Sequence, residues 1–428
     1  MLEAPALTLV LPRPGLWRRL SSLPVFSYYN RLFALVLAAN AGFLGVGPGP
    51  QALDVETLST LVLINLSLAI LVRQQYLINA LFWLATRVPV TWPLWIRRRL
   101  AKVYHFGGVH SGAALAATGW FVVMLGVQVA MYLDDPGRVP LTVLSLSMAL
   151  MGLLLLMVIM ALPWVRGRFH NGFERVHRFA GWGVLLLFWG QMLLTLKHPL
   201  HSGSFWMLVV VTLSIALPWL RLRKVSIDTI RPSRHVAIAR FTHTTPFSGS
   251  SSAISLNPLL EWHSFANIPE PGQEGFRLII SRAGDWTGQF IEHLPSHVWV
   301  KGITTAGVAN VETLFKSVLY IATGSGIGPV MPHLLAANVP IRLIWSTRNP
   351  RQTYGDALVS EILQAQPQAL IWDTDERGKP DLVQLAYDAV LAHGVEAVIC
   401  IANQAVTRRV VRELEARGIA AYGAIWDS

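Results

Sequence analysis

Long apolar stretches fill the first half of the chain, and short alternating segments fill the second. A membrane-spanning helix needs about 20 predominantly apolar residues, because the hydrocarbon core of a bilayer is about 30 Å thick. The stretches that approach or exceed this length are residues 32–46, 58–72, 106–133, 141–164, 179–196 and 205–220. The pattern therefore predicts a multi-pass bundle of six spans over residues 1–224.

A further apolar stretch, residues 77–95, is interrupted by Arg87, Pro89 and Pro93. Proline lacks a backbone N–H and breaks a continuous helix. We therefore interpret this stretch as a helix that lies at the membrane interface. Counting it as a seventh span would reverse the orientation of every later helix.

Charge supports the six-span arrangement. The chain has 428 residues and a net charge of +11, and 19 of its 35 Lys and Arg residues lie within residues 1–224. With the N-terminus inside, 17 of these 19 face the cytoplasm, and Arg138 and Lys197 lie outside, as the positive-inside rule requires. We expect a protein of the cytoplasmic (inner) membrane with both termini in the cytoplasm. The lipid bilayer is then its partner, and nucleic acid is not, because the basic residues form no contiguous stripe.

Histidines mark the inner ends of two predicted spans. His110 lies in the first turns of the third span and His177 in the first turn of the fifth. Neutral imidazole is a good iron ligand, and a haem held between helices needs two facing histidines. These residues predict one haem b, although histidines at a basic helix end also bind headgroups or helix carbonyls. His105 points about 140° away from His110. Met124 and Gln191 occupy the positions of a second ligand pair, so a second haem is not expected.

From residue 225 onwards the periodicity changes. Strands at residues 235–241 and 276–281, separated by turn-rich segments, predict a small β-barrel over residues 225–312. From residue 313, strands alternate with helices, which predicts a parallel sheet flanked by helices. The predicted strands are 317–323, 341–346, 369–373 and 397–401, and the later helices are 357–364, 382–393 and 405–417.

A glycine-rich turn follows the first of these parallel strands. Its glycines would let the backbone approach a pyrophosphate, while the next helix offers free N–H groups. The residues predicted to bind a nicotinamide nucleotide are Gly324, Ser325, Gly326, Gly328 and Pro329. Such a turn can also serve close helix–strand packing alone. Arg348, with Arg351 and Tyr354 nearby, could receive a ribose 2′-phosphate or lie on a solvated loop, so NADPH is favoured and NADH stays open.

The order of these parts resembles the ferric reductase and NADPH oxidase superfamily. Residues 283–287, Ala-Gly-Asp-Trp-Thr, are similar to the step that ends the flavin barrel of that family, and residues 324–329 are similar to its nicotinamide turn. Residues 177–181, His-Arg-Phe-Ala-Gly, resemble the opening of its haem helix. The ending at residues 422–428 looks most like the TmpA-like integral membrane branch.

The resemblance implies FAD in the barrel and a ferredoxin-reductase-like module after the bundle. The implied FAD-binding residues are His263, Ser264, Phe265, Trp286 and Thr287. Residues 263–266, His-Ser-Phe-Ala, stand where the family has His-Pro-Phe-Thr, so the Pro and the Thr are missing. Cys400 and Trp426 are the implied catalytic residues. Cys400 lacks the Gly-Pro that follows it in the family, and a C-terminal Trp can also be a core residue.

Two functions follow from these features. The first is a transmembrane oxidoreductase that passes electrons from cytoplasmic NAD(P)H through FAD to a haem or to an unknown acceptor within the membrane. The second is a catalytically degenerate relative that binds a nucleotide as a sensor or scaffold, because part of each flavin and nicotinamide motif is missing. The first is the favoured hypothesis.

Overall fold

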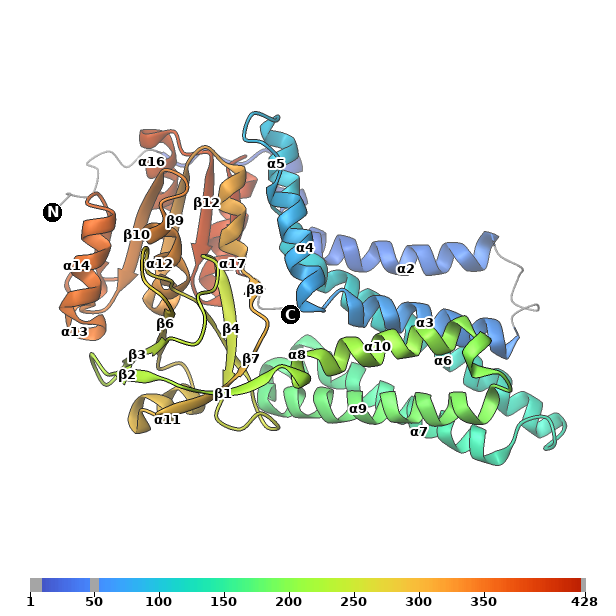
Figure 1. Cartoon of the computed structure of the whole chain (residues 1–428). Coiled ribbons are helices and arrows are strands. Elements are labelled where there is room, and N and C mark those ends of the chain that lie inside the picture. The colour runs from blue at the N-terminus through green and yellow to red at the C-terminus, as the bar shows by residue number, and fades with distance from the viewer. Residues whose placement is uncertain (1–9, 47–53, 425–428) are drawn as a thin grey trace.

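The computed structural model describes residues 10–46 and 54–424. A helical bundle and a mixed α/β part lie side by side, with α4 (Gln75–Thr86) and α5 (Leu94–Leu100) standing between them (Figure 1). The long bundle helices are α2 (Tyr28–Val46), α3 (Val55–Leu71), α6 (Gly107–Asp134), α7 (Leu141–Ala161), α9 (His170–Thr195) and α10 (Gly203–Leu220). They coincide with the six predicted stretches.

Not all of these helices qualify as membrane spans. Among the described residues, three helices are long and apolar enough to cross a membrane, namely Leu94–Asp134, Leu141–Ala161 and Gly203–Leu220. The pair α3 and α4, bent by 69°, would be a fourth if it forms one span. The prediction of six spans is therefore not supported as stated, although its segments form one bundle. In α9 the charged residues Glu174, Arg175 and Arg178 lower the apolar content of the first turns.

Small residues bring α2 and α6 into close contact. A Cβ atom on Gly108 would lie 2.1 Å from the Tyr29 carbonyl oxygen, and one on Gly112 would lie 2.9 Å from the Phe33 carbonyl oxygen. Two glycines spaced by four residues place both backbones on one seam, as is common where helices pack without a hydrophobic driving force. Beside this seam, the Tyr29 hydroxyl and the Ser111 hydroxyl are hydrogen-bonded at 2.6 Å.

Two antiparallel sheets follow the bundle. The first contains β1 (Leu222–Ser226), β7 (His297–Lys301), β4 (Ser250–Ser255) and β5 (His263–Ala266) in that order, with β8 (Thr305–Ala306) paired to β4. The second contains β2 (Asp228–Ile230), β3 (Val236–Phe241) and β6 (Phe276–Ser281). Both sheets and α11 (Asp285–His293) enclose one apolar core that includes Phe241, Leu278 and Phe290. This arrangement is the small barrel that the sequence predicts.

A parallel sheet completes the chain. Its order is β11 (Leu370–Asp373), β10 (Ile341–Thr347), β9 (Val318–Thr323), β12 (Ala397–Ile401) and β13 (Ala420–Gly423). The main helices around it are α12 (Ile327–Ala336), α14 (Asp356–Ala365), α16 (Leu382–His393) and α17 (Gln404–Ala416). Shorter helical pieces are α1 (Leu16–Ser21), η1 (Pro24–Phe26), η3 (Val103–Phe106), α8 (Pro163–Arg168), η4 (Pro199–His201), η5 (Val308–Leu314), η6 (Gly324–Gly326), α13 (Pro350–Tyr354) and α15 (Thr374–Arg377). The barrel and this sheet together form the expected ferredoxin-reductase-like module.

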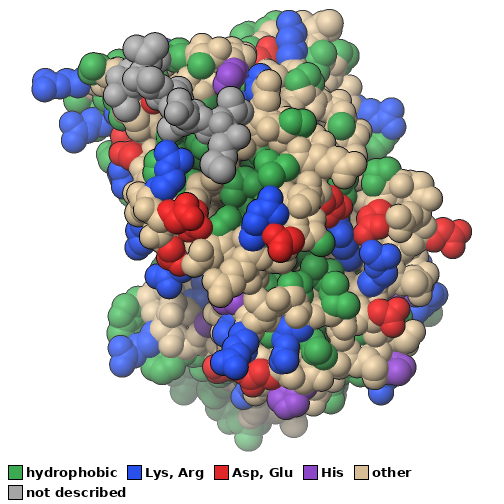
Figure 2. Space-filling view, turned by 90° about the vertical axis from the view of Figure 1, so that its left-hand side faces the viewer, with side chains coloured by type: hydrophobic (Ala, Val, Ile, Leu, Met, Phe, Trp, Pro, Cys, Tyr) green, Lys and Arg blue, Asp and Glu red, His purple; other side chains and the backbone are tan. Residues whose placement is uncertain are grey.

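The face of this module that points away from the bundle carries both signs of charge. Basic and acidic side chains alternate over it, and no field of one sign appears in that view (Figure 2). This agrees with a chain whose net positive charge belongs to its first half. The view offers no basic surface of the kind that binds nucleic acid.

The parallel-sheet part shares its core with α4 and with the segment from α5 to η3. Ile78, Phe82, Ala101 and Tyr104 belong to the apolar cluster that also contains Tyr320 of β9. Asn79 adds polar contacts, because its amide nitrogen donates to the Thr304 carbonyl at 2.9 Å and its amide oxygen accepts from the Ala306 N–H at 2.8 Å. The stretch predicted to lie at the membrane interface, residues 77–95, therefore also packs against the α/β part.

Two buried ion pairs stabilise the contact between this segment and the parallel-sheet part. Arg97, only 3% exposed, donates to the Glu396 carboxylate at 2.7 Å and to the Leu314 carbonyl at 2.7 Å. Lys102 pairs with Glu415 and donates to the Ala421 carbonyl at 2.8 Å. The positive-inside count treated these cations as loop charges, whereas the structure shows that they hold the two parts of the chain together.

We predict that Glu396→Ala destabilises the folded protein by about 3–5 kcal/mol, because it leaves the buried Arg97 guanidinium without its counter-ion. Glu292→Ala is the matched control, because its pair with Arg282 is exposed and such pairs contribute at most about 1 kcal/mol. Chemical unfolding of the purified protein, followed by tryptophan fluorescence, measures both. Equal losses in the two variants would contradict the prediction.

The same pair has a pH signature. Burial raises the pKa of Glu396, but hydrogen bonds from Arg97 and the Lys316 N–H outweigh burial, and the pKa is lowered overall. A carboxyl with a lowered folded-state pKa stabilises the fold above its unfolded pKa of about 4.3 and loses that contribution as the pH falls through the folded value. The stability difference between the native chain and Glu396→Ala should therefore shrink only below pH 4.3.

Candidate functional site

The glycine turn lies where the order of the parallel sheet reverses. β10 and β11 extend from one side of β9, and β12 and β13 extend from the other. The turn Gly324–Gly326 leaves the carboxyl end of β9 at this point and leads directly into α12. In open parallel sheets, ligands bind in the crevice at such a reversal. The fold therefore places the predicted nucleotide residues at the expected edge.

Two of the glycines have a structural reason: Gly326 packs closely on its neighbour, and Gly324 has a positive φ. A Cβ atom on Gly326 would lie 2.0 Å from the Ile401 carbonyl oxygen, at the end of β12. Gly324 has a φ of +49°, which disfavours a side chain, and its carbonyl accepts the Trp345 indole N–H at 3.0 Å. Ser325 is exposed between them. The turn therefore keeps its shape without a ligand, and its packing role and its predicted binding role are compatible.

A buried cluster of three polar side chains connects α12 to η5 and β9. His333 of α12 lies 2.7 Å from Glu312 of η5, measured from Nδ1 to Oε1, and the Tyr320 hydroxyl donates to Oε2 of the same carboxylate at 2.8 Å. All three residues are at most 2% exposed. Burial and the adjacent Glu312 carboxylate raise the pKa of Tyr320. This group fixes α12 relative to the barrel.

The residues expected near a ribose phosphate lie in different environments. Tyr354 is 1% exposed and packs edge-to-face on Trp345, with ring centroids 5.0 Å apart. Burial raises the pKa of Tyr354, and the neighbouring Ser281 and Thr347 hydroxyls lower it in part. Tyr354 is therefore buried and does not lie on a solvated loop edge, and its contact with a phosphate stays a prediction. Arg351 pairs with Asp356 at 2.9 Å.

Arg348 remains the best placed cation. It follows the carboxyl end of β10, its side chain is 80% exposed, and its contact with Asp375 is long, at 3.8 Å. Its proposed contact with a 2′-phosphate stays a prediction.

The predicted flavin residues meet at the edge of the barrel. His263 of β5 stacks on Trp286 of α11 with ring centroids 4.2 Å apart, and Phe265 lies 6.1 Å from the same indole. Ser264 is exposed, as expected for a residue between two that share a strand face. Burial and the charge of His170 lower the pKa of His263. The structure therefore brings His263, Phe265 and Trp286 together and leaves Ser264 apart.

Polar atoms at this stack test its fit to FAD. His263 Nε2 is buried and has no hydrogen-bond partner among the residues described, so it could meet a polar group of a bound molecule. The Thr287 hydroxyl oxygen, however, accepts the N–H groups of Ala283 and Gly284 at 2.8 and 3.0 Å. These bonds form the capping box of α11 and leave the N–H groups of its first turn out of that contact. The aromatic residues fit the ring system of a flavin.

The glycine turn adjoins the barrel. A Cβ atom on Gly328, in the first turn of α12, would lie 3.7 Å from Ile279 of the barrel strand β6. Pro329 follows it in the same turn and is half-buried. The nucleotide turn and the barrel therefore share a boundary, as a reaction between two bound cofactors requires.

The two predicted catalytic residues lie away from this boundary or beyond the described chain. Cys400 is fully buried on the face of β12 that packs against α16 and α17. Burial raises the pKa of the Cys400 thiol to about 12, against a smaller lowering effect of Thr407. The thiolate is the reactive form of cysteine, so this position disfavours a catalytic role for Cys400. Trp426 lies outside the described residues.

The predicted haem ligands face each other in the bundle. The rings of His110 and His177 have centroids 6.2 Å apart. The two imidazoles could therefore hold a haem between α6 and α9, where the haem would supply one-electron chemistry. His110 Nδ1 lies 2.8 Å from the Ala69 carbonyl, and a histidine that donates from Nδ1 to a carbonyl keeps Nε2 free for a metal. His105 instead packs on Tyr104, with centroids 4.4 Å apart. The described residues contain no cluster of three or more His, Cys, Asp or Glu side chains suited to a metal ion.

Comparison with known proteins gives a second line of evidence. A family model described as the C-terminal domain of adenylate-forming reductase 03009 matches residues 308–428. Two adenylate-forming reductases of Coprinopsis cinerea, 03009 and 06235, are 40% and 39% identical to this chain over 415 and 416 residues.

Each match covers 94% of this chain. The chain is similar to adenylate-forming reductases. It spans only 40% of the length of either relative, and each match includes the helical bundle as well as the α/β part. These relatives are named as adenylate-forming reductases and not as ferric reductases or NADPH oxidases.

Solved structures give a weaker likeness. Ferredoxin-NADP+ reductase from Plasmodium falciparum has a TM-score of 0.37 and 13% identity, and covers 48% of this chain and 96% of its own. Ferredoxin NADP+ reductase from Neisseria gonorrhoeae has a TM-score of 0.36 and 12% identity, and covers 45% and 90%. The strand order of the parallel sheet, β11-β10-β9-β12-β13, therefore defines the fold.

An aromatic junction between barrel and bundle was not expected from the sequence. Trp262, next to His263, lies 6.4 Å from Trp219 of α10, and Trp219 lies 5.1 Å from Trp182 of α9, measured between ring centroids. The Lys301 ammonium lies 4.7 Å from the centroid of the Trp262 ring. Burial and Arg178 lower the pKa of Lys301 to about 8, against a smaller raising effect of Glu174. The tryptophans are far apart in sequence, so only the high Trp content hinted at such a cluster.

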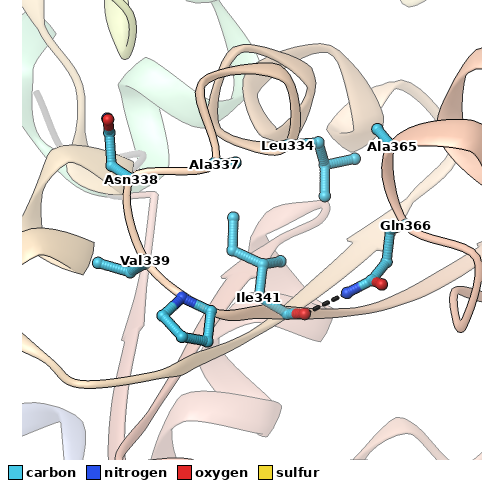
Figure 3. A pocket seen from close by; sticks show the side chains of 8 residues that line it. Leu334, Ala337, Asn338, Val339, Ile341, Ala365 and Gln366 are labelled. Atoms are coloured by element: carbon cyan, nitrogen blue, oxygen red, sulfur yellow. Dashed lines mark hydrogen bonds between the residues drawn. The ribbon is translucent and has the colours of Figure 1, made fainter.

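A surface hollow of about 310 Å³ lies at the opposite edge of the parallel sheet. Figure 3 shows Leu334, Val339, Ile341 and Gln366 around it, with the Gln366 amide bonded to the Ile341 carbonyl. None of the predicted site residues lines this hollow. It also contains no charged side chain, so it is not the candidate site.

We predict that Gly326→Ala destabilises the protein by about 1–3 kcal/mol, because the added methyl group would overlap the Ile401 carbonyl. Gly328→Ala is the matched control, because its Cβ would make only an ordinary contact with Ile279. Thermal unfolding of both variants measures the difference. An unchanged midpoint for Gly326→Ala would show that the turn is looser than described.

Proposed function

We propose that this chain is a membrane-anchored, NAD(P)H-dependent flavin oxidoreductase module that delivers electrons to an acceptor held in or near the helical bundle. The single observation that carries the proposal is the contact between the glycine turn at the sheet reversal and the barrel, made where Gly328 meets Ile279 of β6, because the same barrel carries the proposed flavin residues. A nicotinamide nucleotide and a flavin bound to these half-sites would be neighbours.

FAD, when bound, accepts a hydride from the nicotinamide and releases single electrons. The residues of this chain would bind and orient. The turn 324–328 and the first N–H groups of α12 would receive the nucleotide pyrophosphate. His263, Phe265 and Trp286 would line the flavin ring system, and Arg348 would receive the 2′-phosphate of NADPH. Cytoplasmic placement of the module follows from the charge distribution of the bundle.

The curated relatives support a reducing role. Both are named as reductases, and their similarity to this chain spans the bundle and the α/β part alike. We propose that such a module, whether alone or within a longer polypeptide, carries out an NAD(P)H-dependent reduction. The likeness to ferric reductases and the TmpA-like branch is the finer form of this proposal, and it rests on the motifs alone.

Two observations support the second function, that of a nucleotide sensor or scaffold. The Thr287 hydroxyl occupies backbone donors beside the flavin stack, and Cys400 is buried. Both fit a degenerate module that binds a nucleotide as a sensor or scaffold without turnover.

Turnover separates the two functions. We expect purified protein supplemented with FAD to show flavin absorbance and sustained NADPH or NADH oxidation with an artificial electron acceptor. His263→Ala should lower flavin occupancy, because it removes half of the aromatic stack, whereas His243→Ala, outside the stack, should not. Nucleotide binding without flavin absorbance or oxidation would favour the scaffold function.

We further propose that His110 and His177 hold one haem b between α6 and α9, which would supply a one-electron acceptor near the barrel. The expected result is a Soret band in the purified protein that is lost in His110→Ala and in His177→Ala. His105→Ala is the control and should keep the band, because His105 packs on Tyr104. Absence of a Soret band after haem supplementation would contradict this part of the proposal and leave the flavin chemistry untouched.

A further inference from the structure

Two short helical segments present large apolar side chains outward, and we call their outward faces the collar. The collar comprises α1 and η1 (Leu16–Phe26) and α4 and α5 (Gln75–Leu100). Its exposed apolar residues are Leu16 (74%), Trp17 (81%), Val25 (69%), Phe26 (48%), Trp83 (58%), Leu84 (65%), Trp92 (47%) and Trp95 (57%). Exposed apolar surface of this extent, rimmed by polar residues, marks an interaction site.

The collar is basic without any acidic residue. Its segments, residues 16–26 and 75–100, contain six Arg and no Asp or Glu, and of these six only Arg97 is buried, against Glu396. Arg87 stacks on exposed Trp83 at 4.7 Å, and Arg99 stacks on exposed Trp95 at 4.9 Å, measured from guanidinium carbon to ring centroid. Arginine beside exposed tryptophan is typical of the bilayer interface, where the indole sits at headgroup depth and the cation meets anionic headgroups.

The inward faces are already occupied by the module. Arg98 donates to the Gly418 carbonyl at 3.0 Å, and Arg18 of α1 also reaches Gly418, since a Cβ there would lie 2.8 Å from Arg18 Nη1. Both segments therefore contact the same turn between α17 and β13. The outward faces have fixed positions and cannot fold back onto the module.

The orientation of α4 and α5 suits a surface in the plane of a membrane. α4 turns 69° from α3, and both α4 and α5 stand across the bundle at its boundary with the α/β part (Figure 1). In a bundle that crosses a bilayer, this level corresponds to the cytoplasmic headgroup region. Charge complementarity then selects the occupant, because a surface with exposed Arg18, Arg19, Arg87 and Arg99 and no carboxylate favours an anionic partner.

We propose that the collar binds the anionic lipid headgroups of the cytoplasmic leaflet and thereby seats the nucleotide-binding part on the membrane. The inference rests on the proposed membrane anchoring, but it concerns a separate surface. The apolar side chains enter the headgroup boundary, and Arg87 and Arg99 meet lipid phosphates.

Depth measurements test this. Cys400 is fully buried, so single cysteines introduced as Trp17→Cys and Trp95→Cys can carry a nitroxide label in the full chain, reconstituted in vesicles of phosphatidylcholine with phosphatidylglycerol. Leu213→Cys on α10 is the bilayer reference, and Leu391→Cys on α16 is the aqueous reference. We expect the collar labels at about 5–10 Å into the interface, the Leu213 label deeper, and the Leu391 label in water.

The outcomes separate the two proposals. A Leu213 label in water would overturn the membrane anchoring itself. A deep Leu213 label with both collar labels in water would overturn the collar alone. Collar labels that are shielded from water yet show no contact with lipid would indicate a protein partner and would equally overturn it.

The lipid selectivity of the protein tests whether the collar arginines contact anionic headgroups. In the Arg87→Gln and Arg99→Gln variants, we expect the preference for spin-labelled phosphatidylglycerol over phosphatidylcholine to fall about fivefold per lost guanidinium. Arg240→Gln on the barrel is the control and should leave the preference unchanged. An unchanged preference in the collar variants would overturn the proposed headgroup contact.

Discussion

The buried pair between Arg97 and Glu396 is the constraint on which the arrangement of this molecule depends. Desolvating a cation costs several kcal/mol, and only well-formed hydrogen bonds offset that cost. Arg97 meets the requirement with a carboxylate and the Leu314 carbonyl. Lys102 is stabilised in the same way, by an ion pair with Glu415 and a hydrogen bond to the Ala421 carbonyl. A chain that inserts its bundle without docking its module would leave these charges without partners, so the two parts are coupled.

This coupling matters because it places two half-sites beside the bundle. The glycine turn packs against β12 through Gly326 and against the barrel through Gly328. The barrel in turn meets the bundle through Trp262 and Trp219, and Trp182 extends that contact to α9, the helix that carries His177. A rigid module held in this position can serve an acceptor in the bundle, whereas a loosely tethered one would meet it only by chance.

Much of the fold could be predicted because buried parallel strands have a continuous apolar sequence. α16 and β12 begin and end where the periodicity indicates. β4 was missed because its serine-rich sequence resembles a turn, and only its pairing with β5 and β7 makes it a strand. β13 was missed because a strand of four residues carries too little periodicity. The six bundle helices were found by length, but apolar length alone overestimated how many of them qualify as spans.

The candidate site could be predicted less fully, because side-chain direction depends on partners remote in sequence. Alternation along β12 places Cys400 on the face towards α17, away from the barrel, which the motif alone did not reveal. Tyr354 was predicted to lie either near a phosphate or on a solvated loop, and its burial excludes the loop. Arg97 and Lys102 carry the same charge as exposed loop cations, so their partners in the module could not be inferred from local pattern.

The central claim is that the bundle and the nucleotide module form one rigid unit. A distance measurement between nitroxide labels on exposed Leu162→Cys, at the end of α7, and exposed Leu391→Cys, on α16, tests it most directly. The account predicts one narrow distance distribution in bilayers, unchanged by added nucleotide. A broad or multiple distribution in the otherwise native chain would contradict it.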